Sequence, residues 1–576
     1  MGDAAAWRAR AVDAARLRAL EAEGLAPLVA RVVAARGVPA EGLAAFLDPS
    51  LARLARAEDL PGISDAVQVI LPFLRTKRKI VVFGDYDADG VCASAILVTA
   101  LRRLGGNAEA FIPHRFKEGY GMTAASLARL LCEHADAALV VTVDNGISSP
   151  REVAALRARG VAVVVTDHHL PGEGQPRADA LVNPRVASCP GCADLCGAGV
   201  AFFLASALAR AATAAGLYAG PKFSGPLLVL AGLATVADLV PLKGQNRILV
   251  AQSLALFERC APLGLRELRD HAARSVHAPT VRDYGFLFAP RINAAGRMAT
   301  ADAAFDLLVC EDREAARRCA VTVEGFNATR RGAEARMFEA ACAQIGASEG
   351  AAAVVACGAT GGEGWHLGVA GIVAARLLEH YHVPAAVAVG ETGSVRAPDG
   401  YNVHDALAAA SDHLVRFGGH AAAGGFTITV KPGAFEGFTA AFMAACAKQR
   451  AAAEAVDVRL FDGWVEPKDL TPDLVQALRG LEPFGEGNPE PVFGLRGVAL
   501  REVTVMGAEG KHLSLEFVNR DVPRAVWWGH GERAEGLRAE AAKPHDVYFT
   551  LTSSDYGCAL PHLELRVHDL RPSQPR

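Results

Sequence analysis

The feature that most constrains the fold is a series of apolar strands, each followed directly by an acidic loop, within residues 79–260. Near-continuous apolar runs are typical of strands covered on both faces, and they occur at 79–84 (KIVVFG), 137–143 (AALVVTV) and 161–166 (VAVVVT). A further strand is expected at 108–113, with helices at 91–104 and 124–133. This alternation predicts an α/β domain with a parallel sheet between helices.

Acidic or imidazole-bearing residues follow these strands, and one more carboxylate ends an apolar helix. In chain order they are Asp85, Asp87, Asp89, Asp144, Asp167, His168, His169 and Asp238. The carboxyl ends of parallel strands share one edge of the sheet, so the side chains of the three loops that follow strands should converge. Carboxylates that are so close repel one another unless a cation neutralises them. Oxygen-rich ligands with one imidazole suit Mn²⁺ or Mg²⁺ better than zinc.

Each loop alone also has a simpler interpretation. Asp-Asn-Gly commonly ends a strand in a turn, and adjacent histidines are commonly surface residues. The Asp-x-Asp-x-Asp-Gly pattern also opens an EF-hand, but an EF-hand that began at Asp85 would need Glu where Ile96 stands. The metal hypothesis is stronger because all three loops follow successive buried strands.

In this order, GDYDADG, VDNG, TDHH and ATVADLVPL resemble the four motifs of the DHH phosphoesterase superfamily. More of the chain is similar to one branch, the RecJ single-stranded-DNA exonucleases. That similarity lies in residues 111–121, 290–298, 364–377, 418–426 and 481–493 (LEPFGEGNPEPVF). It extends almost to the end of the chain.

The resemblance implies two-metal hydrolysis of phosphodiesters and a role for each matching residue. Asp87 and Asp144 would hold one ion, with Asp85 as a further ligand because Phe83 stands where relatives often carry histidine. Asp89, Asp144, His168 and Asp238 would hold the other. Asp167 would orient the imidazoles, and His169 would face the scissile phosphate.

The resemblance also implies a site for the strand terminus and 5′→3′ polarity. Its residues would be Arg115, Arg297, Ser394, Arg396, Gly419 and His420. Taken alone, the glycine-dense loop 418–425 is more typical of a helix C-cap at Gly418 that leads into a tight turn. Ala397 stands where relatives commonly have serine.

A length of 576 residues predicts several domains. We expect a helical region (1–75), the DHH domain (76–299), a connecting helix or two (300–345), an α/β DHH-associated domain (346–455) and an OB-type β-barrel (456–576). The barrel would bind single strands through aromatic and basic side chains. Trp527 and Lys511 are the main candidates, with Phe461, Trp464 and Trp528, although most such aromatics lie in cores.

The net charge of −4 gives no overall attraction to nucleic acid, so such binding needs local basic patches. No segment is interpreted as a membrane span, and the alanine-rich start predicts a helix rather than a signal peptide. Most of the twelve cysteines stand singly, as free thiols in a cytoplasmic protein do. Cys189, Cys192 and Cys196 cluster and would hold zinc only with a fourth ligand.

The expected partner is single-stranded DNA, and the RecJ resemblance implies a monomer that works with a helicase and a single-strand-binding protein in DNA repair and recombination. Two alternatives stay open. One is a DHH enzyme for oligoribonucleotides or cyclic dinucleotides, which would not need residues 484–488 or the barrel. The other is a non-catalytic single-strand-binding relative.

Overall fold

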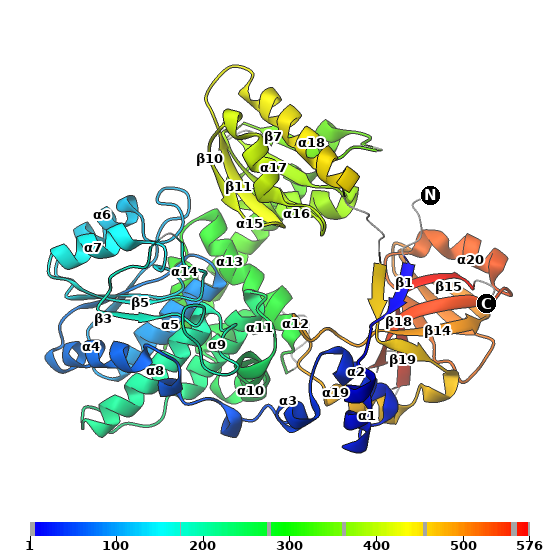
Figure 1. Cartoon of the computed structure of the whole chain (residues 1–576), viewed down its shortest axis with the longest axis horizontal. Helices are drawn as coiled ribbons and strands as arrows, with labels where there is room; N and C mark the ends of the chain where they lie inside the picture. Colours follow the sequence, from blue (N-terminus) through cyan, green and yellow to red (C-terminus); the bar gives the residue numbers. More distant parts are fainter. Residues whose placement is uncertain are drawn as a thin grey trace.

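The chain forms three lobes around a central gap (Figure 1). The structure, a computed structural model, describes residues 6–172, 174–272, 278–348, 350–359, 364–452, 458–554 and 562–573. The predicted boundary at 455/456 therefore lies outside the described residues.

The first lobe contains a fully parallel sheet of five strands in the order β3-β2-β4-β5-β6. Its strands are β2 (Ile80–Phe83), β3 (Ala108–Phe111), β4 (Leu139–Thr142), β5 (Ala162–Thr166) and β6 (Ala180–Val182). Every residue of β2 and β4 is buried, which accounts for their continuous apolar sequences. The predicted parallel sheet is confirmed.

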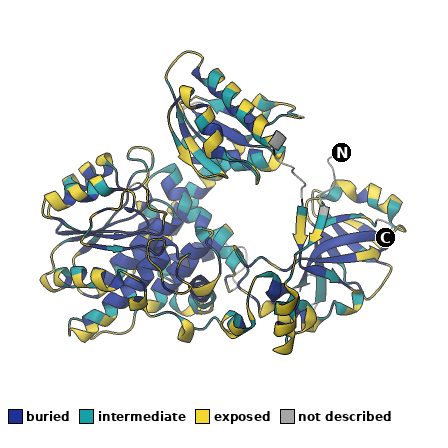
Figure 2. Cartoon of the chain, viewed as in Figure 1, coloured by how far each residue is buried: buried dark blue, intermediate teal, exposed yellow. Residues whose placement is uncertain are grey.

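The helices α4 (Ile63–Thr76), α5 (Ala88–Arg103), α7 (Pro150–Ala158) and α8 (Gly197–Ala214) contact this sheet. The other helices of the lobe are α6 (Ala124–Glu133), α9 (Ser224–Ala237), α10 (Gly244–Cys260), α11 (Leu263–Ala272), α12 (Val281–Asp283) and α13 (Ala289–Met298). The helix α8 is the one described helix that is long and apolar enough to cross a membrane, but 67% of its apolar window is buried inside the protein. It packs against α4, α5 and α9 in the core that Figure 2 shows in dark blue.

The stretch expected to connect the lobes contains two helices, α14 (Asp302–Val309) and α15 (Arg313–Ile345). The second lobe follows with a mixed sheet in the order β10-β11-β9-β8-β7. Its elements are β7 (Val354–Gly358), α16 (Ala370–Tyr381), β8 (Ala385–Val389), β9 (Thr392–Arg396), α17 (Val403–Ala409), β10 (Leu414–Gly419), β11 (Ala423–Ile428) and α18 (Ala434–Ala452).

The third lobe is built on a sheet of seven strands in the order β13-β14-β18-β19-β17-β16-β15. Its elements are β12 (Val458–Phe461), β13 (Gly463–Val465), α19 (Pro472–Arg479), β14 (Phe493–Val498), β15 (Leu500–Met506), β16 (His512–Phe517), β17 (Ala525–Trp527), α20 (Ala534–Glu540), β18 (His545–Ser554) and β19 (His562–Pro572).

The N-terminal region belongs physically to this third lobe. Its helices are α1 (Ala14–Ala22), α2 (Pro27–Ala35) and α3 (Leu43–Leu47), and Leu20 and Val33 share one apolar core with Phe493. The sequence predicts a helix at the start of the chain, and this prediction is wrong for Ala6–Ala9. These residues form the strand β1, which pairs in parallel with β12. The pairing of β1 with β12 and the contacts of Trp7 with Trp464 override the helical propensity of alanine.

The structure pairs two residues of the cysteine cluster, whose role the sequence left open. Cys189 and Cys192 form a disulfide, so neither is a free thiol in this structure. Cys196 is fully buried and caps α8, where its sulfur accepts a hydrogen bond from the Gly199 N–H. The three cysteines therefore do not form a zinc site here.

Candidate metal centre

The first acidic loop connects β2 to α5. Asp87 caps α5, and its Oδ1 accepts hydrogen bonds of 3.0 Å from the N–H groups of Asp89 and Gly90. Asp85 is 1% exposed. A Cβ on Gly90 would lie 2.5 Å from the Asp85 Cβ, so only glycine permits this close turn.

Asp89 is held by the first turn of α8. Its two carboxylate oxygens accept hydrogen bonds from the N–H groups of Gly197, at 2.7 Å, and Ala198, at 2.8 Å. These are among the N–H groups of a helix start that have no partner within the helix, and they favour negative charge. The residues Gly197 and Ala198 thus fix one acid of the centre from a segment more than a hundred residues away.

Asp144 follows β4 and adopts a left-handed backbone conformation, with φ of 62°. This conformation is uncommon for residues other than glycine, although aspartate tolerates it better than most residues. Strained positions of this kind cluster at functional sites. A Cβ on Gly197 would lie 2.5 Å from the Asp144 Cβ, so α8 reaches Asp144 only because residue 197 is glycine.

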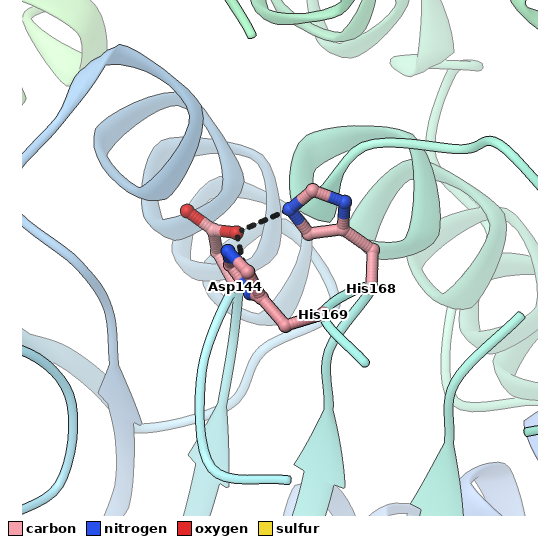
Figure 3. Close-up of side chains that lie close together, drawn as sticks. All are labelled: Asp144, His168 and His169. Atoms are coloured by element: carbon pink, nitrogen blue, oxygen red, sulfur yellow. Dashed lines mark ion pairs between the residues drawn. The ribbon is translucent and has the colours of Figure 1, made fainter. Parts of the chain in front are cut away.

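The two histidines after β5 both face Asp144 (Figure 3). The His168 Nε2 lies 3.0 Å from the Asp144 Oδ1, and the His169 Nδ1 lies 3.9 Å from the same oxygen. The Asp167 Oδ1 lies 2.8 Å from the His169 Nδ1 and accepts hydrogen bonds from the N–H groups of both histidines. Its other oxygen accepts the Ile147 N–H at 2.9 Å.

Three groups of ligand atoms form where these loops converge, and within each group all the ligand atoms lie within 4.8 Å of one another. They are Asp85, Asp87 and Asp144; Asp89, His168 and Asp238; and Asp144, His168 and His169. Asp238 stands at the end of α9, and its Oδ2 lies 3.7 Å from the His168 Nε2. The first two groups contain the residues that the sequence interpretation divides between two ions.

The electrostatics of the cluster call for a cation. Burial and then the charges of Asp89 and Asp87 raise the pKa of Asp144 well above its ordinary value. Burial and the same two charges raise the pKa of Asp238 to about 8. Burial lowers the pKa of His168, which leaves a neutral imidazole. Carboxylates that resist ionisation together become good ligands when a divalent ion neutralises them.

Buried atoms that make no hydrogen bond support the same conclusion. Among the described residues, the Asp85 Oδ1, the Asp144 Oδ1 and the His168 Nε2 are buried side-chain atoms without a hydrogen-bond partner. Buried polar atoms are rarely left unpaired without a functional reason. Oxygen atoms with one imidazole nitrogen are ligands that suit Mn²⁺ and Mg²⁺, so the donor set fits these ions.

Four arginines gather beside this centre. The pKa of Arg297 is lowered to about 10 by burial and then by the neighbouring charges of Arg115, Arg330 and Arg396. Arg297 donates to the Gly368 carbonyl oxygen, just before α16. A Cβ on Gly371, in the first turn of α16, would lie 3.0 Å from the Arg396 Nη2 and 3.5 Å from the Ser394 Oγ. Guanidinium groups at a helix start form a suitable anion site.

The glycine-dense loop is a β-hairpin between β10 and β11, not a helix C-cap. Gly419 has φ of 138°, and a Cβ there would lie 2.3 Å from the Ala423 carbonyl oxygen. Ala423 pairs with Arg396 across β11 and β9. The hairpin therefore brings the exposed His420 to the edge of the sheet where Arg396 lies.

Sequence reasoning missed three contributors to the centre. Gly197 supplies an N–H to Asp89, the Tyr120 hydroxyl lies 3.2 Å from both ring nitrogens of His169, and the Asn293 Oδ1 accepts the Ala88 N–H at the start of α5. Asn293 and Tyr120 lie in segments that resemble RecJ, and this resemblance was the only feature of the sequence that could have indicated their role. The role of Gly197 cannot be recognised in the sequence, because it depends on the position of α8 next to Asp144.

The assignment of Trp527 to DNA binding is wrong, because this side chain is 1% exposed and belongs to the core of the third lobe. Phe461 is buried to the same extent. Trp528 is 54% exposed and packs edge-on against His512. Lys511 is exposed and pairs with Glu509. An aromatic ring beside a lysine thus remains on this surface.

Replacing Asp167 with asparagine is expected to lower hydrolytic turnover by roughly 10–100-fold, the usual effect of losing a partner that orients a ligand. The amide would turn an N–H₂ group toward N–H donors that now share one carboxylate. Asp179→Asn is a matched control, because Asp179 also accepts a backbone N–H, from Val163, far from the centre. Equal turnover in the two variants and the wild type, measured with saturating Mn²⁺, would contradict this role.

The fold and the site define a protein of the DHH class. Residues 79–225 match the family model described as "DHH family, N-terminal domain", residues 349–448 match "DHHA1 domain", and residues 461–569 match "RecJ OB domain".

Among curated proteins, the single-stranded-DNA-specific exonuclease RecJ of Dickeya dadantii is 37% identical, over 82% of this chain and 84% of the relative. RecJ of Escherichia coli K12 is 35% identical, over 88% of this chain and 91% of the relative. The crystal structure of RecJ in complex with Mn²⁺ from Thermus thermophilus aligns with a TM-score of 0.84 and 32% identity, over 100% of this chain and 81% of that chain. The chain belongs to the RecJ family.

Proposed function

We propose that this protein is a single-stranded-DNA-specific exonuclease that hydrolyses phosphodiester bonds in the 5′→3′ direction. The observation that carries the proposal is the convergence of three groups of ligand atoms, two of which contain Asp144, beside a cluster of arginines. The curated relatives are named single-stranded-DNA-specific exonucleases, and they match most of this chain. Polarity rests on the family resemblance.

The centre takes two Mn²⁺ or Mg²⁺ ions in this proposal. Asp85, Asp87 and Asp144 would hold one ion, and Asp89, Asp144, His168 and Asp238 would hold the other. When bound, two such ions lower the pKa of a water molecule and neutralise charge on the phosphate and the leaving oxygen. Structures of the T. thermophilus relative carry Mn²⁺ in one case and Mg²⁺ in another.

His169 acts on the scissile phosphate in the same proposal. Burial lowers the pKa of His169, but the hydrogen bond and the charge of Asp167 outweigh it and raise that pKa to about 9. The ring lies beside the ligand cluster, with its Nδ1 3.9 Å from the Asp144 Oδ1. It stabilises negative charge on the phosphate or donates a proton to the leaving oxygen.

The arginine group would bind the phosphate of the strand terminus, with Arg115, Arg297 and Arg396 as charged partners and Ser394, Gly419 and His420 at the rim. In the described part of the chain, none of these three arginines forms an ion pair with a carboxylate, so their charge is available for an anion. Arg115 stacks over the Tyr86 ring at 5.0 Å, which holds the guanidinium near the centre.

Replacing Arg396 with alanine is expected to lower kcat/KM on a 5′-phosphorylated strand by about 10–150-fold, the value of hydrogen bonds to a charged group. The preference for a 5′-phosphate over a 5′-hydroxyl should fall with it. Arg416→Ala is the control, because Arg416 is exposed on β10 of the same sheet. An unchanged preference in Arg396→Ala would show that the terminus is recognised elsewhere.

The third lobe would hold the strand beyond the site, through Lys511 and the exposed Trp528 rather than Trp527. The protein would act in the cytoplasm as a monomer, in DNA repair and recombination, on strands opened by a helicase and covered by a single-strand-binding protein. Light scattering of the purified protein tests the monomer. Nuclease assays on duplex DNA, with and without a helicase and a single-strand-binding protein, test whether these partners provide the single strands that the enzyme cuts.

The proposed function is tested by incubating the protein and Mn²⁺ with single-stranded DNA labelled at either end, the matching duplex, and dinucleotides. We expect mononucleotides from the single strand, label released first from the 5′ end, and little product from the duplex. Cleavage confined to dinucleotides would favour the small-substrate DHH enzyme. Binding without any cleavage would favour the non-catalytic relative.

A further inference from the structure

A groove of about 1230 Å³ begins beside the metal centre and extends to the third lobe. Its inner end includes Asn293, Arg297 and Arg330, and its outer end includes Thr552 and Arg566. This volume exceeds the roughly 300–1,000 Å³ of pockets for a single small ligand. The groove therefore has room for several linked units of a polymer.

Two large apolar side chains in this groove are exposed to solvent. Leu239 is 74% exposed and Phe286 is 75% exposed, and both line the groove. Leu239 directly follows Asp238 and has φ of 54°, an unfavourable conformation for a bulky residue. The chain thus holds an apolar side chain in solvent, in a strained conformation, next to an acid of the metal centre.

Phe286 is turned outward by an irregular helical turn. It lies in the π-helical segment Tyr284–Phe288, whose end residues Tyr284 and Phe288 are fully buried. Single π turns within helices occur frequently at functional sites. The buried rings of Tyr284 and Phe288 anchor the segment in the core, whereas the exposed Phe286 ring lines the groove.

The charges around these side chains alternate in sign. The Arg282 guanidinium lies 5.5 Å from the Phe286 ring centroid, and Arg297 and Arg330 follow toward the centre. Glu482, Glu486 and Glu490 line the groove from the loop between α19 and β14 of the third lobe, and Glu490 pairs with Arg566 at 3.6 Å. The groove is therefore not uniformly basic, and the exposed apolar side chains offer a second kind of contact.

We propose that Leu239 and Phe286 pack against the faces of unpaired bases in the strand segment next to the metal centre, and that they thereby help to select single strands. This inference deepens the proposed function and rests on it. A base in a duplex has both faces stacked and its edge paired, so it cannot offer a free face to Phe286. Contact of a base with an aromatic ring is sequence-tolerant, because every base has such a face.

The test combines protein variants with strands that lack one base. The measured quantity is kcat/KM for release of the terminal nucleotide, with a single abasic site placed at successive positions inward. For the wild type, we expect a loss of about 5- to 150-fold at one or two positions, the range for a single base contact. On the intact strand, kcat/KM of Phe286→Ala should be lower than that of the wild type by a similar factor. An abasic site at the sensitive positions should not lower kcat/KM of this variant further.

Two more variants separate base contact from general damage. Leu239→Asn removes the apolar side chain but keeps a residue that tolerates positive φ, and Phe286→Trp should restore most of the rate. Val430→Ala, at an 80% exposed apolar residue in the second lobe, is the control and should retain the abasic penalty of the wild type. Thermal unfolding midpoints verify that each variant is folded.

The outcomes are distinguishable. If Phe286→Ala and Leu239→Asn both show the full abasic penalty of the wild type, the bases do not contact these residues and the inference is overturned. If the wild type releases no nucleotide from single strands, the proposed function fails, and the inference fails with it. Cancellation of the penalty in the variants, with rescue by Phe286→Trp, supports the inference.

Discussion

Replacing Asp144 with alanine is expected to abolish hydrolysis while the fold persists. Asp144 groups with Asp85 and Asp87, and its Oδ1 lies 3.0 Å from the His168 Nε2 of the other group. The proposal makes it a ligand of both ions, so the change removes a ligand from each. The loss of kcat should exceed the roughly 10–100-fold that follows loss of an outer partner of a metal ligand. Single-turnover cleavage of a labelled single strand with saturating Mn²⁺ measures it.

The fold of Asp144→Ala should persist because the substitution relieves repulsion. In the absence of a cation, burial and then the carboxylates of Asp89 and Asp87 raise the pKa of Asp144, so removing this acid costs the metal-free protein little. Asp136→Ala is the control, since this aspartate is exposed and pairs with Lys79 away from the centre. Near-normal turnover in Asp144→Ala would refute the assignment.

Replacing Gly197 with alanine is expected to damage the centre almost as severely, although residue 197 is not itself a ligand. The added Cβ would lie 2.5 Å from the Asp144 Cβ and 2.7 Å from its Oδ1. The start of α8 would have to move away, and the N–H groups of Gly197 and Ala198 would no longer hold Asp89. Both the affinity for Mn²⁺ and the turnover should fall. A Mn²⁺ titration followed by the rate of strand cleavage gives the affinity and, at saturation, the turnover.

Gly325→Ala is the control for this effect, because Gly325 lies within α15 and has no atom within 4 Å of an added Cβ. Alanine there should leave activity unchanged and stabilise the helix by about 0.5–1 kcal/mol. If Gly197→Ala bound Mn²⁺ as the wild type does and cut single strands at the same rate, close approach of α8 would not be required.

The parallel sheet and its acidic edge could be predicted because the information is local. Continuous apolar runs mark β2 and β4, and the acids stand immediately after the strands, so the topology of a parallel sheet brings them together. Asp238 was predicted as part of the set although it ends a helix, and its motif in the family resemblance was the reason. The structure brings it to His168.

Features that depend on contacts between distant segments could not be predicted. The strand β1 forms only because β12 lies beside it. Trp527 lies in the core of the third lobe while the neighbouring Trp528 is exposed, and this difference depends on tertiary packing. The role of Gly197 depends on where α8 meets Asp144, and one sequence carries no record of that approach. Exposure of Leu239 and Phe286 is likewise a property of tertiary packing.

The measurement that tests the account most directly is anomalous diffraction from a crystal of this protein soaked in Mn²⁺. Two manganese peaks are expected on either side of Asp144, one beside Asp85 and Asp87 and the other beside Asp89, His168 and Asp238. Density without an ion among these side chains, or manganese bound only elsewhere, would contradict the claim that these acids assemble a pair of divalent ions.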